Sequence, residues 1–277
     1  TSLAPLVILS IGLAPLAAQQ TATRPAASRP ALAQPAQAGN ELDRTKIPPA
    51  GKTPVLRVPP WTKTTLANGA ELIVSERHDL PLVSFSLSII GGSAQYEAAS
   101  RRGLASLAAA MLSEGTTTRD GEALSNAMQL LGTTISTSIG SESGSMGFVS
   151  TSGKFAPTLD ILADMLLNST FPADALERLR AQRLVGLTQA RSQPGSISRN
   201  VFPLTIYGAA HPYGAVVTEA TTRAITRDDV VALHKDYFQP GRAVIIVTGD
   251  VSAAAVKTTV GKALAAWPAG GSRPAFT

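Results

Sequence analysis

The sequence predicts a mixed α/β domain in which helices and a sheet pack in layers. Three observations lead to this class. Apolar residues alternate with serine over Leu82–Ile90, as in a half-buried strand, and Gly91-Gly92 ends the run. Arg101–Leu112 is rich in Ala and Leu and predicts a helix. Along the rest of the chain, predicted strands are interrupted by pairs of predicted helices, which is typical of α/β layered domains.

The first element of the folded body is a predicted β-hairpin. Thr64–Leu66 and Glu71–Val74 are predicted strands, and Asn68-Gly69 lies between them. Asn-Gly between two strands is a strong signal for a two-residue hairpin turn.

The remaining elements are predicted from periodicity and from the residues that end them. Gly132 ends the helix after Arg101–Leu112, and a Gly/Ser-rich turn joins the two strands that follow. The helix Ala173–Ala190 is predicted to be amphipathic and carries several arginines. Strands are predicted over Thr133–Ile139, Ser145–Thr151 and Ala243–Val247, and helices over Asp120–Leu131, Phe155–Leu167, Ala173–Ala190, Ile197–Ile206, Asp228–Tyr237 and Ala253–Leu264.

Composition permits a well-packed core and excludes several functional classes. The chain has 277 residues, of which 44% are hydrophobic and 16% are charged, so global disorder is not expected. No cysteine is present, which excludes disulfides, cysteine-based zinc ribbons and cysteine nucleophiles. The sequence contains no Gly-x-Ser-x-Gly nucleophile elbow.

The net charge of +5 does not indicate a nucleic-acid-binding protein. Residues 1–60 contain six basic and two acidic residues, which leaves 18 basic and 17 acidic residues for 61–277. A nucleic-acid-binding domain needs a concentrated basic face to displace counterions from phosphates. The folded body has no basic run, so we expect no nucleic-acid partner.

The N-terminal segment predicts export. Residues 3–18 are apolar, uncharged and end in small residues, which is typical of a secretory signal peptide over 1–18, cleaved after Ala17 or Ala18. A buried helix of the domain is the alternative. The segment is too short to span a bilayer comfortably. It lacks a basic start and an initiator Met, so we expect a truncated N-terminus. Residues 19–60 hold eight of the 19 prolines and predict a linker, and 61–277 is the predicted folded domain.

No metal site is predicted from the histidines. His78, His211 and His234 include no pair at helical spacing i,i+3 or i,i+4, whereas zinc needs three or four converging ligands. We expect His78 to be exposed after a strand, His211 to lie in a turn before a proline, and His234 to be partly buried on a short helix.

Two charged groups have both a functional and a structural interpretation. Asp228-Asp229 could serve carboxylate catalysis or calcium binding, but adjacent helical residues point about 100° apart, and Thr226 just before them favours a helix N-terminus. The second group could contact a partner or peptide carboxylates, although a solvated helix face is favoured. It consists of Arg178, Arg180, Arg183 and Arg191.

The segment Gly103–Thr116 resembles the zinc-binding helix of the pitrilysin/insulinase (M16) metallopeptidase family with its metal chemistry removed. That family carries His-x-x-Glu-His, in which two histidines bind one zinc ion and the glutamate activates the attacking water. The three positions are held here by Ser106, Ala109 and Ala110, which can neither bind zinc nor take a proton near neutral pH. Further segments match the family's order and spacing: Leu66-Ala67-Asn68-Gly69, Gly91-Gly92-Ser93-Ala94, Leu162 through Pro172, His211-Pro212-Tyr213-Gly214 and Tyr237 through Val251.

The family's third metal ligand is a glutamate on a later helix, and its position in register falls on Gly186. Glu177 is too early by about 13 Å along a helix. Ser106 has no base on its own helix turn, so we expect it to fill space rather than act as a nucleophile. We therefore predict no catalytic residue, no cofactor-binding residue and no metal ligand in this chain.

The resemblance implies an N-terminal half-domain with a mixed, largely antiparallel sheet and helices packed on one side, followed by a missing second half. It also implies a non-catalytic subunit that joins a homologous zinc-bearing subunit in a clamshell around unfolded peptide substrates, with zinc in the partner alone. Together with the signal peptide, it predicts a periplasmic location and no stable membrane span after cleavage. The alternatives are an active zinc metallopeptidase with an unrecognised site and a stand-alone peptide-binding protein.

Overall fold

The computed structural model describes residues 51–52, 55 and 58–273 of the chain. The predicted signal peptide, 1–18, and most of the predicted linker, 19–60, lie outside the described residues. Contacts divide the chain after Val55, and the fold described here belongs to the unit that begins at Leu56. Within the described residues, no helix is long and apolar enough to cross a membrane.

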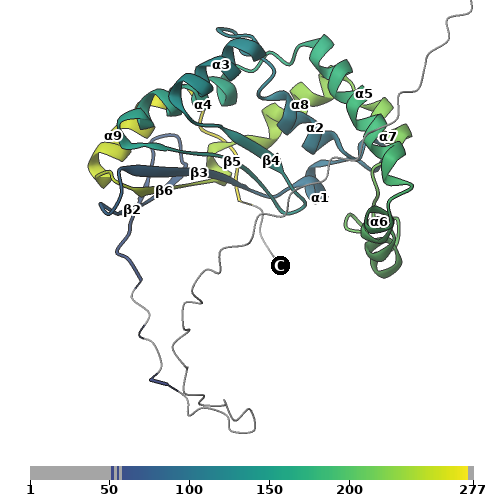
Figure 1. Ribbon diagram of the computed structural model, residues 1–277, viewed down its shortest axis with the longest axis horizontal. Coiled ribbons are helices and arrows are strands. Elements are labelled where there is room, and N and C mark those ends of the chain that lie inside the picture. Colours follow the sequence, from purple (N-terminus) through teal and green to yellow (C-terminus); the bar gives the residue numbers. More distant parts are fainter. Residues whose placement is uncertain (1–50, 53–54, 56–57, 274–277) are drawn as a thin grey trace, which may run out of the picture. The chain divides into compact units, whose positions relative to one another are not determined.

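A six-stranded sheet forms one layer of this unit (Figure 1). Its strand order is β1-β2-β6-β3-β5-β4, so the last strand of the chain lies in the centre. Neighbouring strands are antiparallel except for the parallel pair β2 and β6. The mixed, largely antiparallel sheet predicted from the sequence is therefore confirmed. The strands are β1 Thr62–Thr65, β2 Glu71–Glu76, β3 Leu82–Ile90, β4 Ser136–Ile139, β5 Ser143–Thr151 and β6 Ala243–Gly249.

Helices cover one face of the sheet, as predicted (Figure 1). The helices α2, α4 and α9 contact strands directly, and α5 and α7 pack against each other at one end. The helices are α1 Ser93–Tyr96, α2 Leu104–Met111, α3 Gly121–Leu131, α4 Phe155–Leu167, α5 Ala173–Ala190, α6 Pro194–Tyr207, α7 Glu219–Ala224, α8 Arg227–Tyr237 and α9 Ala253–Ala263. Two of these, α1 and α7, were not predicted, because each is shorter than two turns and gives no periodic signal.

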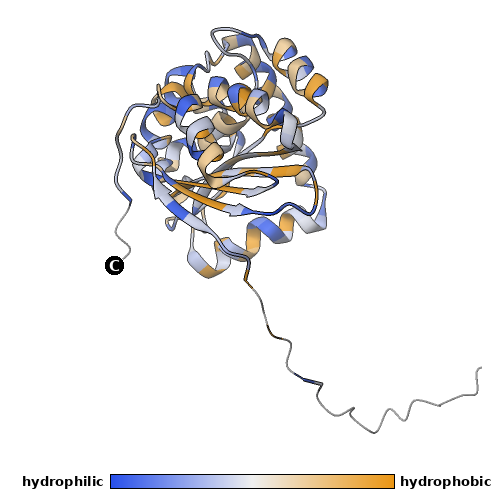
Figure 2. Ribbon diagram, turned by 90° about the vertical axis from the view of Figure 1, so that its left-hand side faces the viewer, coloured by the Kyte–Doolittle hydropathy of each residue, from blue (hydrophilic) through white to orange (hydrophobic). Residues whose placement is uncertain are grey.

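The alternation in β3 places every second side chain, always an apolar one, on the face of the sheet that the helices cover. Val83, Phe85, Leu87 and Ile89 are each at most 1% exposed, and the serines between them lie on the other face. Hydrophobic stretches follow the strands, while the helices mix hydrophobic and hydrophilic turns (Figure 2). The pattern therefore predicts both the strand and the face that it buries.

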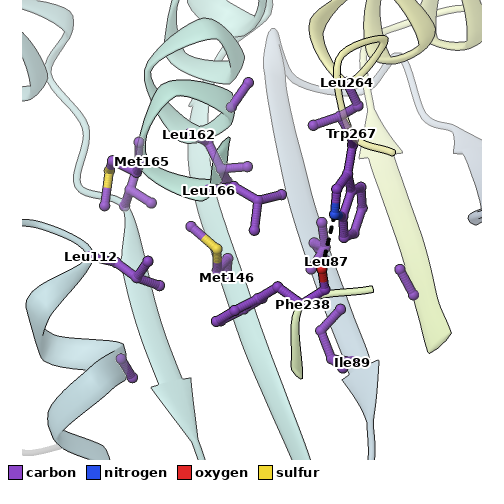
Figure 3. Packing of buried hydrophobic residues seen from close by; sticks show 14 of the residues in the cluster. Leu87, Ile89, Leu112, Met146, Leu162, Met165, Leu166, Phe238, Leu264 and Trp267 are labelled. Atoms are coloured by element: carbon purple, nitrogen blue, oxygen red, sulfur yellow. Dashed lines mark hydrogen bonds between the residues drawn. The ribbon is translucent and has the colours of Figure 1, made fainter. Parts of the chain in front are cut away.

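The core lies between the sheet and α4. Leu162 and Leu166 of α4 belong to the same buried cluster as Met146 of β5 (Figure 3). At one edge of this cluster the indole Nε1 of Trp267 donates a hydrogen bond of 3.0 Å to the carbonyl of Phe238. Burying that donor with a partner avoids the cost of an unsatisfied polar group.

The predicted hairpin between β1 and β2 is present, but its turn is longer than the two predicted residues. The amide of Leu66 donates to the carbonyl of Ala70, so Ala67–Gly69 form a three-residue loop. Gly69 has φ +94, the left-handed conformation that such loops require of their last residue. The Asn68 side chain accepts from the Ala70 amide and donates to the carbonyl of Leu264, which fixes the loop.

Two predicted boundaries are wrong for identifiable reasons. Helix α2 begins at Leu104 instead of Arg101, because Gly103 has φ +98 and interrupts the helical backbone. Strand β4 begins at Ser136 instead of Thr133, because the Thr133 amide donates back to the carbonyl of Met128 and completes the end of α3.

The predicted one-sided burial of α5 is shallow: along the covered side Leu179, Arg183 and Leu187 are only half-buried. Ala175 and Leu176, in its first turn, are buried, and no later residue of the helix is. The rest of α5 and the whole of α6 extend from the layered body (Figure 1), and none of the residues of α6 is buried. This part of the unit therefore offers far more surface than the helices over the sheet.

Candidate functional site

The first turn of α2 is held by a glutamate from the preceding segment. Glu97 accepts hydrogen bonds from the amides of Gly103, at 3.1 Å, and Ala105, at 2.6 Å. These amides belong to the end of the helix where backbone N–H groups lack helical partners and where negative charge is favourable. The start of α2 is thus fixed even though Gly103 offers no side-chain cap.

The three positions of the lost metal motif remain together on α2. Ser106 and Ala110 are one helical turn apart and share a face, which we call the Ser106 face. Ser106 is exposed, Ala110 is half-buried, and Ala109 is 2% exposed in the core. The Ser106 hydroxyl donates a hydrogen bond to the carbonyl of Gly103 at 3.1 Å. Its proton is thus bound within the first turn of the helix, and no general base contacts it. These side chains offer neither a zinc ligand nor a general base.

A guanidinium group from α5 lies on the Ser106 face. Arg183 donates to the carbonyl of Gly103 at 2.7 Å and to the Ser106 hydroxyl at 2.9 Å, across a separation of 77 residues in the sequence. Burial lowers the pKa of the Arg183 guanidinium, and the nearby charge of Glu97 opposes that shift. The structure thus places a positive charge beside the position where the family resemblance would place the first zinc-binding histidine.

The position that corresponds to the family's third metal ligand holds a glycine, which has no side chain. Gly186 is exposed on α5, and a Cβ atom built on it would meet nothing within 4 Å. Glu177 forms an ion pair with Arg180 on its own helix. Among the described residues, no group of three or more His, Asp or Glu side chains could hold a metal ion.

The four arginines on α5 and at its C-terminal end differ in how exposed they are and in what they contact. Arg180 donates to the carbonyl of Ile225 at 2.6 Å and is mostly covered, while Arg191 pairs with Glu219 at 2.7 Å. Arg178 pairs with Glu114, which lies just beyond the end of α2. The favoured interpretation of a solvated face is therefore wrong for Arg180 and Arg183, and the alternative of contact with a peptide or partner stays open for Arg183.

Each histidine lies in a separate local structure. His78 is exposed, and its bond to Asp250 raises its pKa. His211 Nδ1 accepts from the amide of Tyr213 in a turn. His234 lies 2.8 Å from the carbonyl of Leu166, so its Nε2 carries the hydrogen, and burial lowers its pKa. The predicted environments of all three are confirmed.

The capping interpretation of Asp228-Asp229 is also confirmed. Asp229 accepts from the amide of Thr226, whose hydroxyl accepts in return from the amide of Asp229, forming a capping box at the start of α8. Arg101 donates to the same carboxylate at 2.6 Å. This pair is therefore part of the framework around α2 and α8.

A buried carboxylate that the sequence analysis did not single out secures the loop after α2. Asp164 of α4 is 8% exposed and accepts hydrogen bonds from Thr116, Thr118 and Arg119 of that loop and from Asn168. Burial alone would raise its pKa, but these donors outweigh burial, and the pKa of Asp164 is lowered. The available signal was that Asp164 lies between apolar residues on the buried side of α4, since buried acids are rare unless paired.

Family models match most of the described unit. Residues 72–207 match the model described as Insulinase (Peptidase family M16). Residues 224–276 match the model described as Peptidase M16 inactive domain. The two matches include the segments of the sequence resemblance at 91–94, 103–116, 162–172 and 237–251, whereas those at 66–69 and 211–214 lie outside them.

Individual proteins agree with these matches. The chain is 24% identical over 196 residues to the uncharacterized zinc protease YmxG of Bacillus subtilis, covering 70% of this chain and 47% of that protein. A crystal structure of a peptidase M16 inactive domain from Pseudomonas fluorescens is 26% identical, with a TM-score of 0.72, covering 79% of this chain and 53% of that one. The periplasmic protease PqqL of Escherichia coli shares the fold, with a TM-score of 0.67 at 17% identity, covering 78% of this chain and 25% of that one. This chain thus spans about half, or less, of the length of these relatives.

Proposed function

We propose that this chain, which belongs to the insulinase (M16) peptidase family, is a non-catalytic member that acts together with a zinc-bearing homologue. The observation that carries the proposal is the state of the Ser106 face. Helix α2 keeps its position against β4 and the core, but Ser106, Ala109 and Ala110 offer no ligand and no base. The fold of a zinc peptidase half is retained without the groups that its reaction needs.

Electrostatics also argue against a metal on this face. The guanidinium nitrogen of Arg183 lies 2.9 Å from the Ser106 hydroxyl. A zinc ion bound by a residue at position 106 would lie close to this cation, and like charges at such distances repel strongly in a partly buried setting. The proposed role therefore leaves the metal, the water and the general base to the homologue.

The free edge of β4 supports a peptide-holding role for this face. Strand β4 lies at the end of the sheet order, and among the described strands none pairs with its outer edge. The hydroxyl of Thr137 in β4 donates to the carbonyl of Ala109 at 2.8 Å, so the free edge adjoins α2. An extended peptide can add to such an edge through main-chain hydrogen bonds. In the proposed function this edge supplies part of the wall that holds unfolded peptides.

The relatives support the proposed partner and location. The matched part of this chain covers only about half of two of its relatives, which supports pairing with a second, homologous half in a clamshell. One relative is a periplasmic protease, and the apolar segment at residues 3–18 is typical of a signal peptide. We therefore propose the periplasm as the site of action, with no stable membrane span after cleavage.

Co-expression with a homologue that carries His-x-x-Glu-His tests the proposal. We expect the two chains to co-purify, to contain one zinc ion per pair and to cleave unstructured peptides. This chain alone should hold no zinc after dialysis and cleave nothing. Replacing the motif glutamate of the homologue by glutamine should abolish cleavage, because that residue would be the general base.

Two outcomes would favour the alternatives. Stoichiometric zinc and chelator-sensitive hydrolysis by this chain alone would indicate an active metallopeptidase with an unrecognised site. Peptide binding without any complex with the homologue would indicate a stand-alone peptide-binding protein. Either result would contradict the subunit role.

A further inference from the structure

Arg183 differs from the other arginines of its helix in what it contacts. Arg178, Arg180 and Arg191 each form an ion pair, with Glu114, Glu177 and Glu219. Arg183 donates to a carbonyl and a hydroxyl, which are both neutral, and within the described residues no carboxylate oxygen lies within 4.0 Å of it. Its positive charge is therefore not neutralised by direct contact.

The donors of Arg183 are only partly used. A guanidinium has five N–H groups, and the two hydrogen bonds within the described chain occupy two of them. Glu97, whose charge acts on Arg183 without direct contact, already accepts hydrogen bonds from the amides of Gly103 and Ala105. Burial disfavours the charged form of Arg183, so an anion that reaches it would be bound more strongly than by an exposed arginine.

A cavity that is mostly apolar, but whose lining also includes the Arg191–Glu219 ion pair, lies next to this cation. It has a volume of about 310 Å³ and lies among α5, α6 and the segment before α7. A Cβ atom on Gly103 would lie 2.9 Å from the Arg183 guanidinium and 3.0 Å from Val217, so the cation and the cavity wall meet at that point. Leu187, one helical turn after Arg183 and on the same face, also lines the cavity. The other apolar lining residues are Ala190, Ile197, Val201 and Val216.

We propose that Arg183 and this cavity together form a binding site for the C-terminal residue of a peptide that ends in an apolar side chain. The guanidinium binds the terminal carboxylate, and the cavity takes the side chain. The volume lies at the lower limit of ligand pockets, which suits a single aliphatic side chain. The inference rests on the peptide-holding role proposed above and specifies which peptides this chain holds.

Chemistry favours a peptide terminus over other anions. A carboxylate matches the planar fork of a guanidinium, and hydrogen bonds between charged groups are about twice as strong as neutral ones. A phosphate would gain from the cation but nothing from a cavity lined mainly by aliphatic side chains. Peptidases generate new C-terminal carboxylates with every cleavage, so the expected ligand is a product of the reaction proposed for the complex.

The test measures the binding of four fluorescent decapeptides to this chain by anisotropy. The first ends in leucine with a free carboxylate, the second in leucine amide, and the third in glycine with a free carboxylate. The fourth has an internal glutamate and ends in leucine amide. We expect the first to bind about tenfold more tightly than the second, because a charged hydrogen bond is lost, and about tenfold more tightly than the third, because burial of the leucine side chain is lost.

Variants on the same helix assign the effect to one side chain. In Arg183→Gln the preference for the free acid over the amide should fall below about twofold, since the charge is gone. Arg178→Gln is the matched control, because that arginine pairs with Glu114 and does not line the cavity, and it should keep the full preference. Arg183→Lys keeps the charge without the planar fork and should retain part of the preference.

The four peptides also test the inference on the wild-type chain, so the test does not depend on whether Arg183→Gln folds. Equal binding of the leucine acid and the leucine amide would overturn the inference while leaving the peptide-holding role intact. So would equal binding of the leucine acid and the amide with an internal glutamate, because a side-chain carboxylate would then suffice. Absence of binding by all four peptides would contradict both the inference and the peptide-holding role.

Discussion

Two polar clusters flank helix α2, and they differ in how completely their charge is satisfied. After the end of the helix, the Asp164 carboxylate accepts hydrogen bonds from four side chains, one of them the cation Arg119. At its start, the Arg183 guanidinium contacts two neutral acceptors and no carboxylate among the described residues. The first cluster has no capacity left for a ligand and serves the fold. The second retains both charge and donors, which is what a binding site needs.

The largest expected effect is the loss of the Asp164 cluster. Asp164→Ala should lower the free energy of unfolding by about 3 kcal/mol, because it leaves Thr116, Thr118 and Arg119 without their shared acceptor. Urea denaturation at pH 7 measures the change. Asp160→Ala, an exposed position one turn earlier on α4, is the control and should cost less than about 0.5 kcal/mol. If both changes lowered the free energy of unfolding equally, the hydrogen bonds of the Asp164 cluster would not contribute the stability assigned to them.

The same carboxylate predicts how stability depends on pH. The folded-state pKa of Asp164 is lowered, so its contribution is fully present above the unfolded pKa of about 3.9 and is lost as pH falls through the folded value. The difference in unfolding free energy between wild type and Asp164→Ala should therefore shrink below pH 4. Denaturation curves at pH 7, 5, 4 and 3 measure it. A difference that stays constant over this range would contradict the assigned charge.

The sequence predicts those parts of the molecule that depend on local periodicity. Strand β3 and helix α4 have the bounds expected from their patterns, because both bury a regular apolar face. The resemblance likewise locates Ser106 and Gly186 on two helices, α2 and α5, which contact each other in the structure. In these cases the apolar pattern along the chain is enough to predict which side of the element is buried.

The sequence does not predict what depends on tertiary contacts. Arg183 and Ser106 are 77 residues apart, and no local pattern distinguishes Arg183 from the arginines around it. Helix α5 is predicted to be amphipathic, but only Ala175 and Leu176 in its first turn are buried, and Leu179 in the next turn packs against the core while partly exposed. The Asp164 cluster depends on a loop whose conformation no propensity rule gives. Both polar clusters were therefore found from the structure.

A smaller effect on stability than that of Asp164→Ala is expected at the Arg183 cluster, and it separates the two clusters most clearly. Arg183→Gln should change the free energy of unfolding by less than about 1 kcal/mol, because it removes two hydrogen bonds to neutral acceptors and leaves no buried charge behind. The Ser106 hydroxyl keeps its own bond to the Gly103 carbonyl. Urea denaturation beside Asp164→Ala gives the comparison directly. If Arg183→Gln lowered the free energy of unfolding as much as Asp164→Ala, the main role of the guanidinium would be to stabilise the contact between α2 and α5. Its unused donors would then not indicate a ligand. A nearly neutral change in stability combined with loss of the free-acid preference would instead assign Arg183 to binding.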